Sequence, residues 1–372
     1  MIHEMTRTTV AAAALAMLLF ASRAVHADDL ITCGFSEVRA MRIVETNVTT
    51  LWSWNATNSN LPASLKGLFA TTSDCKPCPD GKVLITSSGG NTYSGAVALV
   101  DPATSNALFY AVATNAHSAE LLPSNRVVVA LSYQTNGNRL VVFDLATNDV
   151  ELFSVPLWGA HGVVWDEQRQ ILWGLSDSFI AGYKLTNWNS NPQFVQVSWT
   201  GLLDGGGHDM YPVPNSPYLL VTTALHCWYF HRDTRYFTKH PVLGDVPSIK
   251  GASVHPVSGR TVYVTADGPW WSEYLRFLSP SNTLNFPGDH FYKARWIPPV
   301  MLPQLLISPT ATNTMRVHWP STWASYVLEQ KASYATTNWI APVEPVQDDG
   351  TNKFIIVSPS EGQSFYRLLK TP

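Results

Sequence analysis

The sequence feature that most constrains the fold is a weak internal repeat. A turn followed by a strand pattern occurs in Pro79–Thr86, Pro123–Ala130, Asp166–Trp173 and Pro256–Tyr263. A strand followed by a turn recurs between these copies, as in Val97–Thr104. Each repeat unit spans about 45 residues, which suits four short strands and is typical of the blades of β-propellers.

The segments between the turns have the length and composition of β-strands. Arg126–Ala130 and Arg139–Phe143 are two of these runs, and the joins between runs are rich in Gly, Asn, Asp, Ser and Pro. No convincing amphipathic helix follows the N-terminal segment. The sequence therefore predicts an all-β domain, and residues 28–300 have room for six repeat units. The expected fold is a six-bladed β-propeller.

The first strand patterns of this domain form an incomplete repeat unit. Glu37–Val44 and Leu51–Trp54 look like part of a blade without its opening strand. We expect them to complete the last blade, because closing the ring in this way leaves few exposed sheet edges.

The N-terminus has the pattern of an export signal. Arg7 precedes an apolar run from Val10 to Phe20, and small residues follow up to Ala27. The run is shorter than the roughly 20 apolar residues of a membrane-spanning helix. We expect removal of residues 1–27, a propeller over residues 28–300, and a secreted or periplasmic protein with no membrane span.

The pattern changes after a Pro-rich joint, Ile297–Pro303. Residues 301–372 contain short alternating segments such as Met315–Trp319 and Phe354–Val357. These segments predict a small C-terminal β-sandwich-like module. It resembles the fibronectin type III modules of secreted bacterial proteins.

Charge and cysteine content narrow the class of protein. The formal net charge is −3, which argues against a nucleic-acid partner because phosphate binding needs a basic excess. The cysteines are Cys33, Cys75, Cys78 and Cys227. The spacing of Cys75 and Cys78 suits a redox or zinc site, but the helix and the further ligands that such sites need are missing. We expect structural thiols or one long-range disulfide.

Aligning the repeats places three histidines at equivalent positions. His117, His161 and His208 follow one another at intervals of about one repeat unit, each next to the inner strand of its blade. Inner strands line the central channel of a propeller, so these side chains are expected to converge at one mouth. The same alignment sets Lys76 opposite Glu120 and places Lys250 beside the position of His161.

Further polar and aromatic residues are expected near this mouth. Asp74 and Asp209 fall close to the histidines in the alignment, and Lys293 and Arg295 lie on the approach of the last blade. Trp270 and Trp271 are expected to form a loop wall at the rim. The predicted funnel thus contains imidazoles, carboxylates and several cations.

These residues allow several functions. In a catalytic interpretation, the cations bind the carboxylate of an acidic sugar, and a histidine or lysine moves a proton, since imidazole titrates near neutral pH. The catalytic candidates are His117, His161, His208, Lys250 and Glu120. The ligand-binding candidates are Lys76, Asp209, Trp270, Trp271, Lys293 and Arg295.

Three other interpretations remain open. The three histidines could ligate a catalytic divalent metal ion with one open position. They could instead be structural, each fixing one corner of a blade by hydrogen bonding. The funnel could also bind a glycan or a protein without catalysis, and the 14 tryptophans of the chain would suit sugar rings.

Four segments carry a resemblance to a known family. They are Asn115–Pro123, Ala160–Asp166, Gly205–Val213 and Tyr292–Trp296. Over about residues 30 to 297 the chain resembles a bacterial propeller family of unknown function. The resemblance implies a six-bladed propeller and supplies no activity. The sequence therefore predicts a secreted propeller that binds an anionic, uronate-containing saccharide, and cleavage of that saccharide by a lyase or hydrolase reaction stays open. The alternative is a non-catalytic glycan- or protein-binding module with structural histidines.

Overall fold

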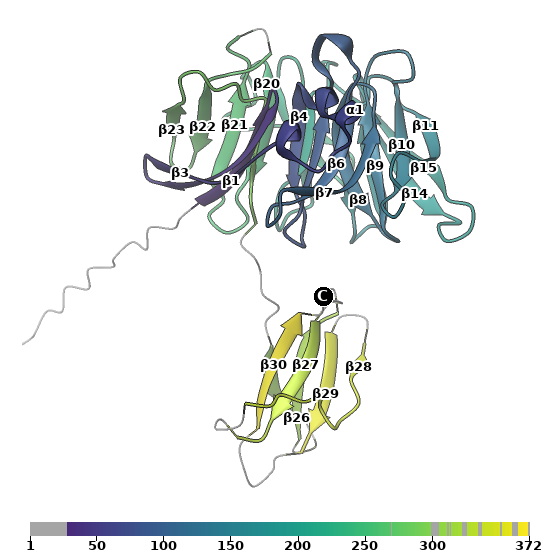
Figure 1. Ribbon diagram of the computed structural model, residues 1–372, viewed down its shortest axis with the longest axis vertical. Coiled ribbons are helices and arrows are strands. Elements are labelled where there is room, and N and C mark those ends of the chain that lie inside the picture. The colour runs from purple at the N-terminus through teal and green to yellow at the C-terminus, as the bar shows by residue number, and fades with distance from the viewer. Residues whose placement is uncertain are drawn as a thin grey trace, which may run out of the picture. The chain divides into compact units, whose positions relative to one another are not determined.

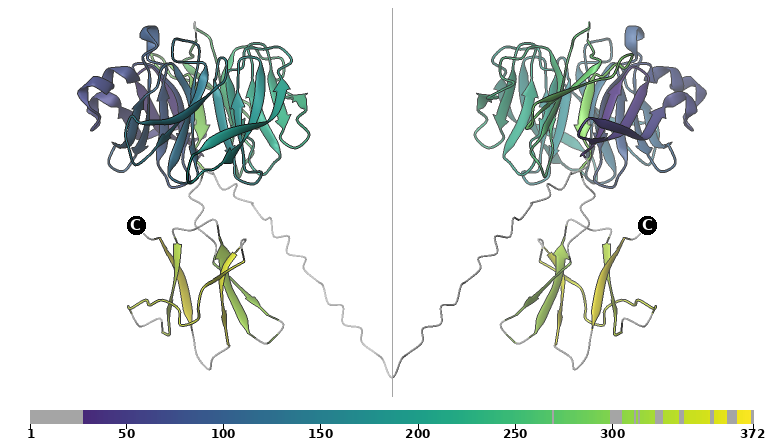
Figure 2. Two further views of the ribbon diagram at one scale, coloured as in Figure 1. Left: turned by 90° about the vertical axis from the view of Figure 1, so that its right-hand side faces the viewer. Right: turned by 90° about the vertical axis from the view of Figure 1, so that its left-hand side faces the viewer.

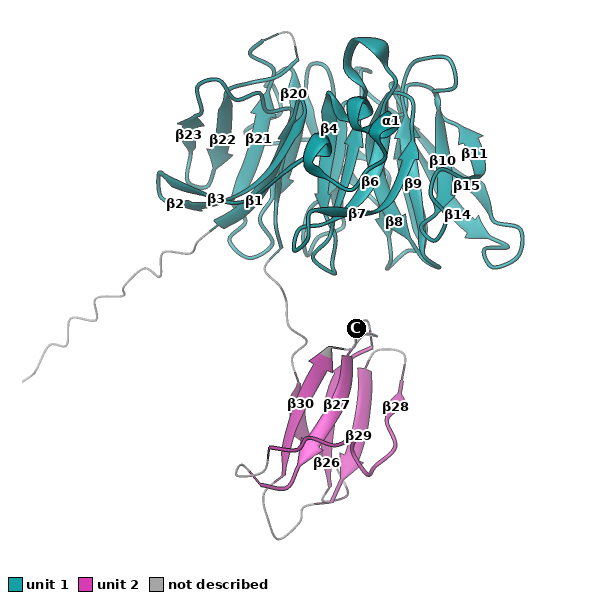
Figure 3. Ribbon diagram, in the orientation of Figure 1, with its two compact units in different colours: residues 1–298 teal, residues 299–372 magenta. Residues whose placement is uncertain are grey.

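The structure is a computed structural model. It describes residues 28–268, 270–298, 305–310, 312, 314–321, 326–333, 337–349, 352–358 and 364–370. The chain divides into two compact units, Met1–Pro298 and Pro299–Pro372 (Figure 3). The predicted export signal over residues 1–27 lies outside the described residues, as does most of the predicted Pro-rich joint.

The described part of unit 1 consists of four-stranded antiparallel sheets (Figure 1). From inner to outer strand they are β24 (Lys293–Trp296), β1 (Asp28–Gly34), β2 (Glu37–Val44), β3 (Asn47–Asn55); β4 (Thr72–Pro77), β5 (Val83–Ser87), β6 (Ala96–Asp101), β7 (Asn106–Val112); β8 (Ala116–Leu122), β9 (Arg126–Leu131), β10 (Arg139–Asp144), β11 (Glu151–Pro156); β12 (Gly162–Asp166), β13 (Ile171–Leu175), β14 (Phe179–Thr186), β15 (Gln193–Gly201); β16 (Asp209–Pro212), β17 (Tyr218–Thr222), β18 (Cys227–His231), β19 (Phe237–Lys239); and β20 (Ile249–Val254), β21 (Thr261–Thr265), β22 (Tyr274–Leu278), β23 (Asn282–Asn285).

Helical structure is confined to short connections. The link from β3 to β4 contains the 3₁₀ turns η1 (Ala56–Asn58) and η2 (Gly67–Phe69) and the helix α1 (Ala63–Lys66), which the sequence patterns did not predict. A further 3₁₀ turn, η3 (Gly90–Thr92), lies between β5 and β6. Within the described ranges, no helix has the length and apolar character needed to cross a membrane.

The inner strands of the sheets form a closed ring. β4 contacts β8, β8 contacts β12, β12 contacts β16, β16 contacts β20, β20 contacts β24, and β24 contacts β4. The sheets therefore surround one axis, as the blades of a β-propeller do. Figure 2 shows their strands from two opposite sides. The all-β prediction is confirmed, and so is the propeller architecture.

The ring closes by pairing the two ends of the unit. β24 pairs with β1 in antiparallel register, from Leu30 opposite Trp296 to Cys33 opposite Lys293. The backbone N–H of Tyr292 donates to the carbonyl oxygen of Cys33 at 2.7 Å and extends this pairing. The expectation that the N-terminal strands complete the last blade is confirmed. Each of the two strands thereby loses an exposed edge.

The core lies between neighbouring sheets, which explains the apolar runs in the sequence. In β9, Val127 and Val129 pack in the cluster shared with β5, β6 and β7, whereas Val128 and Ala130 pack in the cluster shared with β12, β13 and β14. Both faces of the strand are buried, so its apolar residues are consecutive rather than alternating. Each buried valine side chain contributes about 1.5–3 kcal/mol to folding.

Unit 2 has its own small core. Its strands are β25 (Leu306–Pro309), β26 (Met315–Pro320), β27 (Tyr326–Lys331), β28 (Gln347–Asp348), β29 (Asn352–Val357) and β30 (Phe365–Lys370). They form one sheet in the order β25-β26-β29-β28 and a pair, β27-β30. Val317 and Ile355 of the larger sheet pack with Leu328 of the pair. The two sheets therefore share one apolar interior.

The closing joint predicts a sharp difference between two glycines. A Cβ atom on Gly34, the last residue of β1, would overlap the backbone carbonyl of His290, whereas a Cβ on Gly67 would meet no atom within 4 Å. Gly34→Ala should lower the free energy of unfolding by about 2 kcal/mol or more, because the backbone at the joint must shift. Gly67→Ala should change it by less than about 1 kcal/mol. Urea denaturation of both variants measures the difference, and equal midpoints would contradict this account of ring closure.

Candidate functional site

Four charged side chains fill the axis of the ring. They are Asp74 of β4, Asp209 of β16, and Lys293 and Arg295 of β24. None of the four is more than 2% exposed. Nη2 of Arg295 lies 2.6 Å from Oδ1 of Asp209 and 3.1 Å from Oδ1 of Asp74. Nζ of Lys293 lies 3.1 Å from the same Asp209 oxygen. We call these four residues the hub cluster.

The hub cluster is electrically balanced and hydrogen-bonded to the surrounding strands. Its two carboxylates face two cations. The Ser118 hydroxyl donates to Oδ2 of Asp74 at 3.0 Å, and the backbone N–H of Ala252 donates to Oδ2 of Asp209 at 3.2 Å. Nη1 of Arg295 donates to the carbonyl oxygen of Ala252 at 3.2 Å. Buried charges are tolerated when they are paired and hydrogen-bonded in this way.

Mutual attraction keeps the hub cluster ionised. Burial alone would raise the pKa of Asp209, but the charges of Arg295 and Lys293 lower it below the ordinary value. The pKa of Asp74 is lowered against burial by the same two cations. Conversely, burial would lower the pKa of Lys293, whereas Asp209 and Asp74 raise it. All four groups are therefore charged at neutral pH.

This placement corrects part of the sequence analysis. Asp209, Lys293 and Arg295 were expected to contact a ligand at the mouth, but they lie in the hub and bind one another. The repeats predict which sheet of the ring a residue belongs to, whereas the position of its side chain along the ring axis depends on where each strand begins. Lys293 and Arg295 are both residues of β24 itself rather than of its approach.

Lys76 and Glu120 also face each other, as expected, but away from the histidines. Nζ of Lys76 lies 3.2 Å from Oε2 of Glu120 and donates to the carbonyl oxygen of Val163 at 2.5 Å. Glu120 follows His117 by three residues on β8, a separation of about 10 Å along a strand. Burial raises the pKa of Glu120, and Lys76 opposes that effect. These two residues pair with each other at a different position along the ring axis from the histidines. The expectation that Glu120 acts beside the histidines is therefore wrong.

The structure brings the three histidines together. The ring centroids of His117 and His161 are 4.4 Å apart, and those of His161 and His208 are 5.9 Å apart. His117 lies on β8 at an irregularity in its pairing with β9, and the other two directly precede β12 and β16. Equivalent positions at the same strand end thus meet at one end of the axis.

Hydrogen bonds fix the tautomer of each imidazole. Nδ2 of Asn115 donates to the carbonyl oxygen of Tyr133 at 2.8 Å, so its Oδ1 accepts from Nε2–H of His117 at 3.0 Å. Nδ1–H of His161 donates to the carbonyl oxygen of Gly159 at 2.7 Å. Nε2 of His208 accepts from Nζ of Lys250 at 3.2 Å.

Two imidazole nitrogens are left without a partner. Among the described residues, nothing hydrogen-bonds to the buried Nδ1 atom of either His117 or His208. Given the tautomers above, the first of these atoms carries a lone pair and the second carries a hydrogen. Both atoms are shielded from solvent, so they are unpaired polar atoms within the wall of the site.

The imidazoles are poor bases. Burial lowers the pKa of His161 to about 4. Burial, followed by the charge of Lys250, lowers the pKa of His208 to about 3. Burial and the neighbouring His161 hold the pKa of His117 well below its ordinary value. All three are neutral at neutral pH, which corrects the expectation of a general base that titrates near working pH.

The arrangement does not favour the metal interpretation. The rings of His117 and His161 overlap at an interplanar angle of 35° rather than pointing to one centre, and the Lys250 ammonium occupies Nε2 of His208. In the described part of the chain, no group of three or more His, Cys, Asp or Glu side chains could hold a metal ion. All four cysteines are free and buried. The alternative of a long-range disulfide is therefore not observed, although the side chains of Cys33 and Cys75 are within hydrogen-bond contact of each other.

A cavity of about 770 Å³ opens beside the histidines. It combines aromatic rings with hydroxyl and amide groups. The aromatic residues that line it are Phe35, Tyr93, Tyr133, Trp270 and Tyr292, and the polar residues include Thr71, Ser73, Asn115, Ser132 and Asp177. We call this space the axial cavity. Its size is in the usual range for small-ligand sites, about 300–1,000 Å³.

The two tryptophans of the predicted rim have different surroundings. Trp270 lines the axial cavity and stacks on Phe35, with ring centroids 5.0 Å apart. Trp271 packs against His290, with ring centroids 4.1 Å apart, and is not one of the cavity-lining residues. Trp270 is thus placed to contact a ligand, whereas Trp271 supports the loop behind it.

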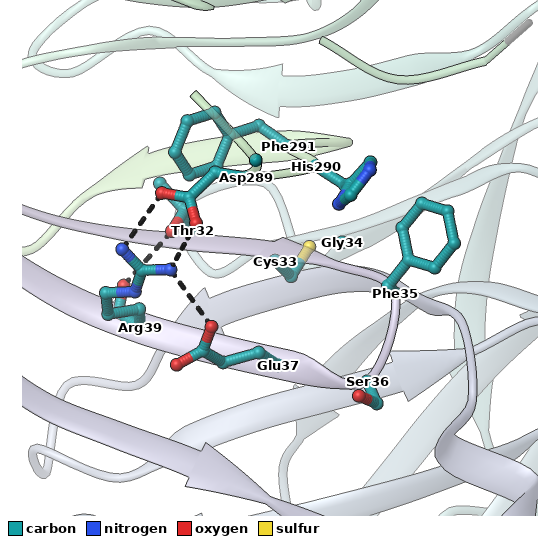
Figure 4. Close-up of a pocket in the computed structure, with 11 residues that line it drawn as sticks. Thr32, Cys33, Gly34, Phe35, Ser36, Glu37, Arg39, Asp289, His290 and Phe291 are labelled. Atoms are coloured by element: carbon teal, nitrogen blue, oxygen red, sulfur yellow. Dashed lines mark hydrogen bonds and ion pairs between the residues drawn. The ribbon is translucent and has the colours of Figure 1, made fainter. Parts of the chain in front are cut away.

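A smaller pocket of about 200 Å³ lies on the other side of Phe35 (Figure 4). The Arg39 guanidinium lies between Asp289 and Glu37 there, at 2.8 Å and 3.0 Å. The Asp289 hydrogen bond raises the pKa of Arg39 against burial. The charged groups of this pocket are paired with one another, so the axial cavity is the better candidate site.

Lys250 differs from the other cations around the axis. Lys76, Lys293 and Arg295 each have a carboxylate partner. For Lys250, no carboxylate lies within 4.0 Å among the residues that the structure describes, and its ammonium contacts His208. Burial lowers the pKa of Lys250. A half-buried cation without a counter-ion marks a place for an anionic ligand.

The sequence analysis missed Tyr133, Tyr292 and Asn115. Asn115 orients His117 from two positions upstream, and Tyr292 directly precedes Lys293 at the cavity wall. Both lie in segments that carry the family resemblance, which was the available signal. Tyr133 follows β9 in a loop outside those segments, and no sequence pattern singles it out.

Residues 32–302 match a family of unknown function, DUF6528. The chain belongs to this family. The DUF6528 match spans the propeller strands from Thr32 of β1 onward and every site residue described above. No curated protein matches the sequence.

Solved structures with a similar course of the chain include one titled "Crystal structure of Nidogen/Laminin Complex". The DUF6528 chain is 11% identical to that chain, and the match covers 72% of this chain and 98% of that one, with a TM-score of 0.49.

The hub cluster predicts a large cost for breaking a buried pair. Asp209→Asn should lower the free energy of unfolding by about 3–5 kcal/mol, because it leaves the charges of Arg295 and Lys293 uncompensated. Asp245 is a matched control, since its pair with Lys239 is on the surface and its side chain is 80% exposed. Asp245→Asn should cost less than about 1 kcal/mol. Thermal and urea denaturation compare the variants, and similar losses would contradict the structural role of the hub.

The neutral histidines predict a pH dependence of stability. The pKa of His161 is about 4 in the folded chain and about 6.5 in an unfolded one. Between these values the unfolded chain binds more protons, so the free energy of unfolding falls as the pH is lowered through this window. His161→Asn should reduce that slope. Urea denaturation at several pH values measures it, and an unchanged slope would show that His161 is protonated in the folded protein.

Proposed function

We propose that the protein is an exported six-bladed propeller with a fibronectin type III-like C-terminal module, and that its axial cavity binds a uronate-containing saccharide. The observation that carries the proposal is the isolated charge of Lys250 beside His208. Lys250 is not itself one of the residues that line the cavity, but its partner His208 is. The carboxylate of a uronate bound against His208 would supply the missing counter-ion. The remaining cations of the axis are already paired and do not compete for it.

The walls of the axial cavity suit a sugar. Tyr93, Trp270 and Tyr292 present aromatic rings, which contact the apolar faces of pyranose rings. Polar side chains such as Thr71 and Asp177 line the same cavity and can hydrogen-bond to sugar hydroxyls. Aromatic surface with a few placed polar groups is the usual composition of a small-ligand site.

The imidazoles suit hydrogen bonding better than proton transfer. The uncharged rings of His117, His161 and His208 line the cavity, and a neutral imidazole has one N–H donor and one acceptor nitrogen rather than a proton to give or take. Binding is therefore the function that the geometry supports best.

Cleavage is a second candidate, supported by one observation. Burial lowers the pKa of Lys250, so a larger fraction of this amine is unprotonated than in an exposed lysine. An unprotonated amine next to a uronate could remove the proton beside the carboxylate and begin a β-elimination. The leaving oxygen would then need a proton from solvent or a neighbouring hydroxyl.

A binding experiment tests the proposal directly. Calorimetric titration with a uronate oligosaccharide should show saturable binding that Lys250→Met weakens about 30-fold, equivalent to about 2 kcal/mol. The methyl ester of the same oligosaccharide should bind as weakly as the acid binds to the variant, because it lacks the charge. Lys184→Met removes an exposed lysine of β14 and should change nothing.

The same samples distinguish binding from cleavage. Elimination creates an unsaturated uronate that absorbs in the ultraviolet, whereas binding leaves the absorbance constant. Equal affinities for the acid and the ester, or an unaffected Lys250→Met variant, would overturn the proposed carboxylate site.

A further inference from the structure

A row of exposed aromatic side chains leads out of the axial cavity. Tyr133 lines the cavity, and its ring lies 5.6 Å from that of Trp158 in an edge-on arrangement of 79°. Trp158 is 60% exposed, although most indole rings in folded proteins are largely buried. The row thus begins inside the cavity and reaches solvent.

Backbone contacts hold Trp158 in place. Its carbonyl oxygen accepts from the Ser176 hydroxyl at 2.6 Å and from the Asp177 N–H at 3.2 Å. Gly159 follows with a φ of 57°, and a Cβ there would lie 2.8 Å from the Tyr133 ring. The glycine lets the chain turn closely beneath that ring. The two aromatic groups are therefore preorganised rather than loosely exposed.

A second aromatic pair lies on the next sheet. Phe179 follows Asp177 by two residues, and its ring lies 5.6 Å from that of Trp199 on β15. Trp199 is 59% exposed. The N–H of Leu202 donates to the carbonyl oxygen of Ser178 at 2.8 Å and ties the end of β15 to this loop.

The charge along the row differs from that around Lys250. The Asp177 carboxylate lies in the cavity wall beside Tyr133 and accepts a hydrogen bond from the Tyr133 hydroxyl. A second carboxylate would be repelled there, whereas a neutral sugar hydroxyl could donate to Asp177. Separate aromatic rings with a hydrogen-bond acceptor between them suit successive uncharged sugar rings, which have apolar faces and polar edges.

We propose that Tyr133, Trp158 and Trp199 bind neutral sugar residues that continue from the uronate in the axial cavity. This inference rests on the proposed function and adds the class of ligand. The ligand is an oligosaccharide or polysaccharide with one carboxylate-bearing residue followed by uncharged residues, rather than a polyuronate or a single sugar.

Ligand length and two tryptophan variants test the proposal. The probes are a uronate methyl glycoside and a tetrasaccharide with the same uronate at one end and neutral sugars beyond it. The tetrasaccharide should bind the unmodified protein about tenfold more tightly than the monosaccharide. Trp158→Ala and Trp199→Ala should remove most of this gain and leave the affinity for the monosaccharide unchanged.

Two controls keep the outcomes distinct. Tyr236 is 75% exposed in the connection between β18 and β19, at the opposite strand ends from the cavity, and Tyr236→Ala should change neither affinity. Trp158→Phe should keep part of the length effect, because it retains a ring.

Each result has one meaning. If the monosaccharide binds but the tetrasaccharide is no tighter, or if Trp158→Ala leaves the length effect intact, the row binds no sugar and the inference fails while the proposed function stands. Tighter binding of a polyuronate than of the mixed tetrasaccharide would overturn the neutral-sugar assignment. If neither probe binds, the proposed function itself is wrong.

Discussion

The buried ion cluster on the axis is the interaction on which the rest of the structure depends. Asp74 and Asp209 come from strands on different sides of the ring, and Lys293 and Arg295 reach both from β24. Sheets that are distant in sequence are thereby joined at their innermost strands. The desolvation cost of each charge is offset only when all four are present, so the ring has one preferred diameter and one preferred register at its centre.

The same cluster shapes the chemistry of the mouth. Because its cations are neutralised internally, they add no net attraction for an anion, and the charge of Lys250 stands out. Burial beside these groups keeps the imidazoles uncharged. The mouth is therefore an aromatic and hydroxyl-rich surface with uncharged imidazoles and the Asp177 carboxylate in its wall and Lys250 behind His208, which is a surface for recognition more than for acid–base catalysis.

The sequence contains much of the fold because the fold repeats. Turn and strand copies reveal the sheets, and the incomplete first unit reveals the pairing of β1 with β24. Equivalent positions also bring His117, His161 and His208 together, since repeats preserve position around an axis. The repeat does not set the position of a side chain along the ring axis, because that position depends on where along its inner strand the residue lies. For that reason the sequence patterns place Lys293 and Arg295 at the mouth and Glu120 beside His117, whereas the structure does not.

The sequence patterns do not predict the pKa values of the site residues or the contacts between loops. The lowered pKa values of the histidines follow from burial. The sequence around a single histidine in a turn does not show whether its side chain is buried. Tyr133 depends on Asn115, which directly precedes β8 of the same sheet, and on Gly159, which lies in the connection to the next sheet. A side chain of this kind has no periodic signal, and only the folded chain shows what it faces.

The pairing of β24 with β1 also bears on how the ring is assembled. The strand that completes the sheet of β1, β2 and β3 is the last of its unit to be synthesised, so the inner edge of β1 stays open until the other sheets exist. Until β24 is in place, the unpaired edge of β1 can form backbone hydrogen bonds with a strand of another chain. A circular permutant that joins β24 directly to β1 through a short turn would convert this distant contact into a hairpin, and ring formation would no longer depend on the meeting of two remote chain segments.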